Sequence, residues 1–248
     1  MADLNDKLKR FAELLSNAKN IACLTGAGMS TESGIPDYRS SSGLYNTMTS
    51  EEVFDIYAFR REPERFYKVI GPLYSAIVEA KPNSGHLALH RLEEEFGKNV
   101  AVATQNIDGL HQEAGSRNVY EVHGTMSTLT CPKCGRTAMA SGHLDEFRKG
   151  ETLRCACGAV FKPDITFYGE MLPQDAFAGA AMAFADCDLA IVLGTSLVVY
   201  PAAALPSQRR ARTPLVIINK TATSMDGEAT LVFNDSIGKI LPAALELL

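Results

Sequence analysis

Residues 20–28 read NIACLTGAG, a short apolar run that ends in two closely spaced glycines. Such a run is typical of a buried strand that turns sharply at its end. Four further stretches have the same character and a fifth is weaker: residues 99–104, 119–122, 187–193, 214–219 and 229–233. Amphipathic or helical patterns lie at residues 4–15, 84–96 and 174–185. Apolar runs that alternate with helices predict an α/β fold, a parallel sheet covered on both faces.

Residues with ligand-binding chemistry follow several of these strands. In an open parallel sheet, ligands bind beyond the carboxyl ends of the strands, where the strand order reverses. We therefore expect one site that gathers the following positions: Gly26, residues 104–108, His123, residues 194–196 and Asn219.

Two stretches interrupt the alternation of strands and helices. Residues 34–82 are aromatic and mostly helical in pattern, and residues 126–170 carry two cysteine pairs with little helical pattern. We predict a small domain inserted in two pieces. The small domain would hold residues 34–82 and 126–172, and the large domain residues 1–33, 83–125 and 173–248.

The composition is that of a globular protein, with 46% hydrophobic and 21% charged residues over 248 positions. A formal net charge of -5 argues against nucleic acid as a main partner, because phosphate binding needs a basic surface. The first ten residues are polar and charged, and no run approaches the ~20 apolar residues of a membrane helix. We expect a cytoplasmic monomer without membrane association. Cys23 and Cys187 lie in apolar runs and are expected to be buried.

The glycine pair after the first strand has two readings. It is either a loop whose amides bind a phosphate or a simple tight turn, because position 31 is Thr rather than the third glycine of a dinucleotide loop. Residues 34–39 (GIPDYR) then combine a hinge, an acid, an aromatic ring and a guanidinium that can pair with phosphate. A proline turn with a surface ion pair is the alternative.

Residues 104–108 (TQNID) and His123 are the candidates for binding and catalysis. A carboxylate beside an apolar Ile suits the amino group of a carboxamide, although Asp108 could simply cap a helix. His123 is the best candidate for a general base, because an imidazole titrates near pH ~6.5, and a structural histidine is the alternative. His111 is expected to be structural.

The two cysteine pairs predict a metal site. Cys131 and Cys134 form a C-x-x-C pair, and Cys155 and Cys157 form a tighter C-x-C pair. Four thiolates fill a tetrahedral shell and leave no position for a substrate, so we expect structural Zn²⁺. An iron centre is the alternative.

These motifs, in this order, resemble the sirtuin family of NAD-dependent protein-lysine deacylases over nearly the whole chain. The matching segments are 26–30, 34–39, 104–108, His123-Gly124, the four cysteines, 167–170, 194–196 and 218–219. The resemblance implies a Rossmann-type large domain, a small domain with a zinc ribbon and helices, and NAD between them. It implies these NAD contacts: Gly26, Ala27, Gly28, Thr31, Asp37, Tyr38, Arg39, Gln105, Asn106, Ile107, Asp108, Gly194, Thr195, Ser196, Asn219, Lys220 and Ile237.

The resemblance also implies a reaction. The oxygen of an acetyl-lysine would attack the anomeric carbon of the nicotinamide ribose and expel nicotinamide. Asn106 would order that ribose or its water, and His123 would act as general base on a ribose hydroxyl. The products would be free lysine, nicotinamide and 2′-O-acetyl-ADP-ribose.

Acetyl-lysine peptides and proteins are the implied partners, held as an added strand between two segments. The implied peptide contacts are Ile165, Phe167, Gly169, Glu170, Leu197 and Val199, with core packing as the alternative for Phe167 and Val199. Relatives that favour acidic acyl groups carry a Tyr-x-x-Arg pair, whereas this chain has Tyr67 and Ile70 at those places. We expect neutral acyl groups, acetyl first, because a buried carboxylate without a cation is costly.

Three other functions compete with deacetylation. A mono-ADP-ribosyltransferase could use the same fold, with a protein nucleophile that intercepts the ribose. A non-enzymatic zinc-ribbon module would have no use for His123, Asn106 and Asp108. A dehydrogenase is disfavoured, because no acidic ribose-binding residue stands about twenty residues after the glycine loop.

Overall fold

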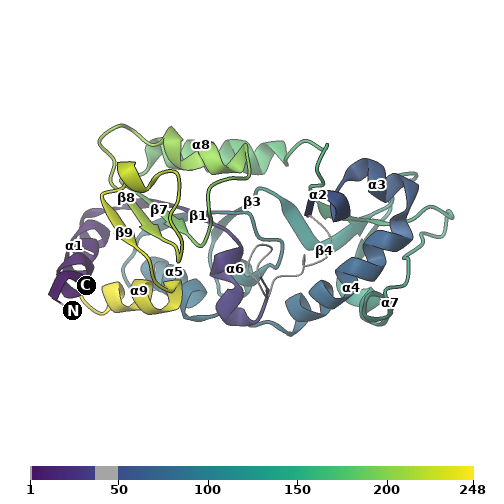
Figure 1. The fold of residues 1–248 in the computed structure, drawn as a ribbon, viewed down its shortest axis with the longest axis horizontal. Helices are drawn as coiled ribbons and strands as arrows, with labels where there is room; N and C mark the ends of the chain where they lie inside the picture. Colours follow the sequence, from purple (N-terminus) through teal and green to yellow (C-terminus); the bar gives the residue numbers. More distant parts are fainter. Residues whose placement is uncertain (1, 37–49) are drawn as a thin grey trace.

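The main sheet has the strand order of a doubly wound nucleotide-binding fold. The computed structural model describes residues 2–36 and 50–248 (Figure 1). Its six strands are β1 (Asn20–Thr25), β2 (Asn99–Thr104), β3 (Asn118–Glu121), β7 (Leu189–Leu193), β8 (Leu215–Ile218) and β9 (Leu231–Phe233). They lie in the order β3-β2-β1-β7-β8-β9, and all neighbours are parallel. Counted along the chain, this is the order 3-2-1-4-5-6, so the predicted Rossmann-type sheet is confirmed.

Helices cover both faces of this sheet, which explains why its central strands are apolar throughout (Figure 1). One core lies under α1 (Ala2–Asn17), α5 (Ser84–Glu94) and α9 (Ile237–Leu245) and contains Phe11 and Leu89. The other lies under α8 (Gln174–Asp186) and the 3-10 helix η4 (Ala202–Gln208) and contains Phe184. The strands β7 and β8 are buried at every position.

The strand limits differ slightly from those predicted. The run at residues 187–193 is a strand only from Leu189, because Cys187 ends α8 and the Asp188 carboxylate accepts from the Lys19 and Asn20 amides. The third strand begins one residue earlier than predicted, at Asn118. Cys23 and Cys187 are buried as expected, and all six cysteines are free.

A second, antiparallel sheet stands beside the first. Its central strand β4 (Gly124–Thr130) lies between β5 (Thr137–Met139) and β6 (Lys162–Ile165). This sheet shares a separate core with α2 (Ser50–Val53), α3 (Ile56–Arg61), α4 (Pro63–Glu79) and α7 (Leu144–Lys149) (Figure 1).

The centre of this second core is aromatic. The ring of Phe167 meets those of Phe54, Phe59 and Phe66 at centroid distances of 6.1, 5.2 and 5.2 Å, two of them edge to face. The helix α7 was not predicted, since its six residues are too few to display a helical period. It forms because Phe147 is fully buried against Tyr74, with Gly150 in the left-handed conformation that ends the helix.

The second sheet, its helices and its own core have the character expected of an inserted small domain. Its boundaries, at residues 33/34, 82/83, 125/126 and 172/173, stay a prediction. In residues 2–36 and 50–248, no helix is both long and apolar enough for a membrane span.

The remaining elements are short. The 3-10 helices η1 (Ala27–Met29) and η2 (Thr31–Ser33) follow β1, and α6 (Leu110–Glu113) follows β2. Two more 3-10 turns are η3 (Ala140–His143) and η5 (Asp226–Glu228).

Candidate active site

One cavity of about 930 Å³ lies where the carboxyl ends of the main-sheet strands face the second sheet. Its lining comes from both sides, with Gln105 and Asn219 after the strands β2 and β8, and Ile165 at the end of β6. This volume lies at the upper end of the range for ligand sites, so the cavity can hold an extended ligand. Its place is the one that the sequence predicts, beyond the point where the strand order reverses.

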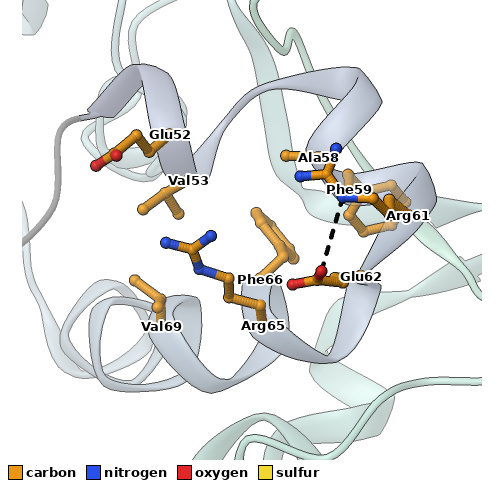
Figure 2. A pocket seen from close by; sticks show the side chains of 9 residues that line it. All are labelled: Glu52, Val53, Ala58, Phe59, Arg61, Glu62, Arg65, Phe66 and Val69. Carbon is orange, nitrogen blue, oxygen red and sulfur yellow. Dashed lines mark ion pairs between the residues drawn. The ribbon is translucent and has the colours of Figure 1, made fainter.

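A second cavity, shown in Figure 2, lies among α2, α3 and α4. It encloses only about 10 Å³, the room of a single water molecule. The Arg61–Glu62 ion pair at its rim, 3.6 Å long, is largely exposed. This cavity is too small to compete as a substrate site.

Glycines bring the first loop against the strand β7 at the base of the larger cavity. The Gly28 amide donates to the Gly194 carbonyl at 2.9 Å, and the Gly26 amide donates to the Leu193 carbonyl at 3.0 Å. A Cβ on Gly194 would lie 2.5 Å from backbone atoms of Gly28 and Met29, and Gly194 has φ +62°. The glycines are therefore required by backbone contact and conformation, in addition to any contact with a phosphate.

Ser30 joins two of the predicted ligand contacts in a hydrogen-bond network. Its hydroxyl donates to Asp108 Oδ2 at 2.6 Å and accepts from Asn106 Nδ2 at 2.9 Å. Asn106 Nδ2 also donates to the Gly26 carbonyl, so the amide's Oδ1 is the atom that can accept from a ligand. Burial raises the pKa of the Asp108 carboxyl, and bonds from Ser30 and the Leu110 amide oppose that rise. Asp108 Oδ1 accepts from the amide of Leu110, the first residue of α6, but the N-cap of that helix is Gly109, so Asp108 is not its capping residue.

A buried histidine pair lies beneath this network. His86 and His111 are 0% and 1% exposed, with ring centroids 4.7 Å apart. The Thr25 hydroxyl lies 3.0 Å from His111 Nε2 and donates to Thr104 Oγ1. The same Thr104 oxygen accepts from the backbone N–H of Asn106. His111 is outside the cavity lining, as expected of a structural histidine.

His123 lies between the strands β3 and β4 and lines the cavity. Its Nδ1 is 3.1 Å from the Gln105 carbonyl oxygen, which can only accept, so Nδ1 carries the proton and Nε2 keeps the lone pair in the neutral ring. Burial lowers the pKa of His123, against a smaller opposing effect of the bond to Gln105. The neutral base form is therefore favoured near neutral pH.

The opposite end of the cavity is lined by Thr195, Ser196, Asn219, Lys220 and Ile237. All five are among the predicted NAD contacts. The structure adds Glu32, Asp235 and Ser236 to this end. The pair Asp235-Ser236 follows β9 and could have been found by the strand-end rule, whereas no local pattern distinguishes Glu32.

Segments 165–170 and 197–200 supply the wall that faces the second sheet. Ile165, Gly169, Glu170 and Val199 line the cavity, as predicted. Phe167 and Leu197 do not line it: they are 1% and 2% exposed. Phe167 belongs to the aromatic core, the alternative role that the sequence had left open. Leu197 has φ 55°, a conformation that few residues other than glycine adopt.

The four predicted metal ligands converge. The sulfurs of Cys131, Cys134, Cys155 and Cys157 all lie within 4.8 Å of one another. Two of the distances, Cys131–Cys157 and Cys134–Cys155, are 3.5 and 3.6 Å. A Zn²⁺ ion with bonds of about 2.3 Å in a tetrahedron separates its sulfurs by about 3.8 Å, so the cluster fits Zn²⁺ and the C-x-C pair closes around it.

Most of the predicted site residues meet in this one cavity. Ala27, Gly28, Thr31, Gln105, Ile107 and Gly194 line it as well. Gly26 and Asp108 do not line it: the Gly26 carbonyl accepts from Asn106, which does, and Asp108 is linked to Asn106 through Ser30. Asp37, Tyr38 and Arg39 lie outside the described residues. Sequence reasoning missed Phe54 and Phe177, aromatic residues that only the tertiary fold brings to the cavity.

Together these features define an α/β protein with a dinucleotide-sized site at the switch point of its main sheet. A four-cysteine metal cluster lies beside its second sheet. The model of the Sir2 family matches residues 26–201. An NAD-dependent protein deacetylase of Clostridium perfringens is 43% identical over 253 residues, which cover 98% of this chain and 100% of the relative. The chain belongs to the Sir2 family.

Other relatives and solved structures agree with this assignment. An NAD-dependent protein deacylase of Archaeoglobus fulgidus is 39% identical over 98% of this chain and 96% of its own length. A Sir2 enzyme structure superposes with a TM-score of 0.90 at 39% identity and covers 98% of both chains. A Sir2 structure with a p53 peptide and NAD⁺ has a TM-score of 0.87 at 39% identity, over 96% of this chain and 97% of the other.

Proposed function

We propose that the protein is an NAD-dependent protein-lysine deacetylase that transfers the acetyl group to ADP-ribose. The observation that carries the proposal is the common cavity, in which His123, Asn106 and Ile107 face a wall suited to a peptide, residues 165–170. Two relatives at 43% and 41% identity are named NAD-dependent protein deacetylases. A Sir2 structure with a deacetylated p53 peptide and 3′-O-acetyl-ADP-ribose has a TM-score of 0.90.

The cavity suits NAD as the cosubstrate. Gly28 and Gly194 allow close backbone approach at the switch point, where dinucleotides bind in doubly wound folds. Thr195, Ser196 and Ile237 would receive the adenosine half, with Gln105 at a ribose. Ile107 and Asp108 would hold the nicotinamide carboxamide, since a carboxylate can accept from its amino group.

The chain's own residues then have distinct tasks in the reaction. Asn106 is fixed through Ser30 and the Gly26 carbonyl, which leaves its Oδ1 to order the ribose or a water. His123 would take a proton on Nε2 from a ribose hydroxyl, because Nδ1 is committed to Gln105. Positioning contributes as well: a neutral amide oxygen is a poor nucleophile and must be held in line with the anomeric carbon.

An acetyl-lysine peptide would occupy the wall formed by segments 165–170 and 197–200. Backbone pairing with an extended peptide reads few side chains, so we propose a broad range of protein substrates. Solved structures similar to this chain hold an acetylated peptide in one case and a propionylated peptide in another.

The metal cluster serves structure in this proposal. Zn²⁺ on four cysteines has no open position, so its chemistry is to bind two chain segments together. Zinc would hold the C-x-x-C turn that follows β4 against the C-x-C turn that precedes β6. The small-domain boundaries, a monomeric state and a cytoplasmic location belong to the same proposal.

Incubation of the protein with an acetyl-lysine peptide, with and without NAD, tests the function by product mass. We expect an NAD-dependent decrease of about 42 Da in the peptide mass, the net change when hydrogen replaces an acetyl group, together with nicotinamide and O-acetyl-ADP-ribose. ADP-ribosylated protein without deacetylation would instead identify a mono-ADP-ribosyltransferase. If neither product forms, the proposed function has no support.

A further inference from the structure

The peptide-facing wall is bonded to its surroundings along its backbone. The Thr166 amide donates to the His123 carbonyl at 2.8 Å. The Tyr168 amide donates to the Phe54 carbonyl at 2.7 Å, and the Tyr168 carbonyl accepts from the Ile56 amide at 3.1 Å. The position of segment 165–170 therefore sets the shape of the cavity. It also sets the distance between this wall and His123, the proposed base.

One ion pair closes the turn at the end of this wall. Lys162 Nζ lies 2.9 Å from Glu170 Oε2, and the same Glu170 oxygen accepts from the Phe167 amide at 2.9 Å. Lys162 Nζ also donates to the Ile165 carbonyl at 2.8 Å and lies 4.5 Å from the centroid of the Phe167 ring. Lys162 is thus bonded to the beginning and the end of segment 165–170.

This pair is shielded from water, unlike most ion pairs of the described chain. The side chains of Lys162 and Glu170 are 17% and 27% exposed. The Lys81–Glu113 pair has the same length, 2.9 Å, but its side chains are 77% and 44% exposed. Exposed pairs stabilise little, whereas removing one member of a shielded pair leaves a charge without its partner.

We propose that Lys162 is a positioning residue for the protein substrate, because its ion pair with Glu170 holds segment 165–170 in the conformation that receives the acetyl-lysine peptide. The inference rests on the proposed deacetylase function. Glu170 lines the cavity, but its carboxylate is already bonded to Lys162 and Phe167. Its main task is therefore to fix the wall, and Lys162 acts through it without touching the substrate.

The test compares steady-state kinetics of Lys162→Met, Lys162→Arg and Glu170→Gln with wild type, varying peptide and NAD separately. We expect KM for the peptide to rise about 10-fold in Lys162→Met and in Glu170→Gln, because each variant loses one charge-assisted hydrogen bond. We expect kcat at saturating peptide and KM for NAD to stay within about 2-fold, because binding of the peptide restores the wall. Lys162→Arg should restore KM for the peptide to within about 3-fold of wild type, since its guanidinium keeps the charge.

Lys81→Met is the matched control, and its kinetics should equal those of wild type. An unchanged peptide KM in Lys162→Met overturns the proposal. A general defect also overturns it, in which kcat and thermal stability fall and KM for NAD rises as much as KM for the peptide. If Lys162→Met does not fold, Glu170→Gln and Lys162→Arg decide in its place by the same criteria. Failure of the proposed function is distinguishable, because the wild-type protein would then release no deacetylated peptide at all.

Discussion

The ring of His123 is fixed by the backbone of Gln105, whose carbonyl oxygen lies 3.1 Å from Nδ1. Gln105 follows the strand β2 and His123 follows β3, two neighbours in the main sheet. The register of two parallel strands therefore decides which imidazole nitrogen is available as a base.

His123→Ala should lower kcat for deacetylation by about 100- to 10,000-fold, the usual contribution of a general base. NAD should still bind, which calorimetry can measure, and His143→Ala provides the histidine control at a site beside Glu146 in the predicted small domain. Burial lowers the pKa of His123, so activity should persist below pH ~6.5 before protonation of the ring removes the base. Loss of NAD binding in His123→Ala would show that this residue is structural.

Gly194→Ala should destabilise the protein and weaken NAD binding, because the added Cβ would press on the backbone of Gly28 and Met29. Gly97→Ala is a matched control, since Gly97 also has φ +62° but open space around it. We expect a cost of about 1 to 2 kcal/mol for Gly97→Ala, from the left-handed conformation alone. Urea denaturation measures the free energy of unfolding of both variants. Equal losses of stability in Gly194→Ala and Gly97→Ala would contradict the close contact of Gly194 with the Gly28 loop.

Acid should weaken the fold through the buried histidine pair. Burial lowers the pKa of His86 to about 4 and of His111 to about 3. Below pH ~6.5 the unfolded chain binds protons at these histidines that the folded chain does not, so stability falls as the pH falls. Each histidine can contribute up to about 1.4 kcal/mol per pH unit in that window.

The comparison of wild type with His86→Gln isolates this effect from that of the carboxylates. Urea denaturation at several values between pH 6.5 and pH 4.5 should give a shallower decline for the variant. An identical slope would mean that His86 already binds its proton in the folded state.

Removal of the metal should unfold the second sheet and thereby abolish activity. The sulfurs of Cys131 and Cys157 come from turns that precede β5 and follow α7, and a shared ion would hold these turns together. Hydrogen exchange after chelation should show loss of protection in β4, β5 and β6, with the main sheet protected. Readdition of Zn²⁺ should restore both protection and activity, and full activity in metal-free protein would oppose a structural role.

Acetyl-lysine should be turned over well and succinyl-lysine hardly at all. Among the described residues that line the cavity, Lys220 is the only lysine or arginine, and its charge lies close to that of Asp235. Tyr67 and Ile70 are buried, and the Tyr67 hydroxyl donates to the Phe161 carbonyl at 2.6 Å. Equal kcat/KM for the two acyl groups, measured on one peptide sequence, would contradict this prediction.

The sequence was sufficient for the parts of this molecule that depend on local pattern. The apolar runs located every strand of the main sheet, and the cysteine spacing located the metal cluster. The strand-end rule predicted that Gln105, His123 and Asn219 share one site, and all three line the same cavity.

Tertiary packing decided what local pattern could not. Phe167 follows a strand, as other site residues do, but its ring is enclosed by Phe54, Phe59 and Phe66. The short helix α7 depends on burial of Phe147. The ion pair of Lys162 with Glu170 joins residues eight positions apart across a turn, and no sequence pattern distinguishes them from surface charges.

The passage of the chain from one sheet to the other has a mechanical consequence. Only Val122 and His123 separate the last residue of β3 from the first residue of β4. His123 is tied to the first sheet by its ring and to the second by its carbonyl, which accepts from Thr166. If the two sheets move relative to each other as ligands enter and leave, these two bonds limit how far the imidazole can move from either sheet.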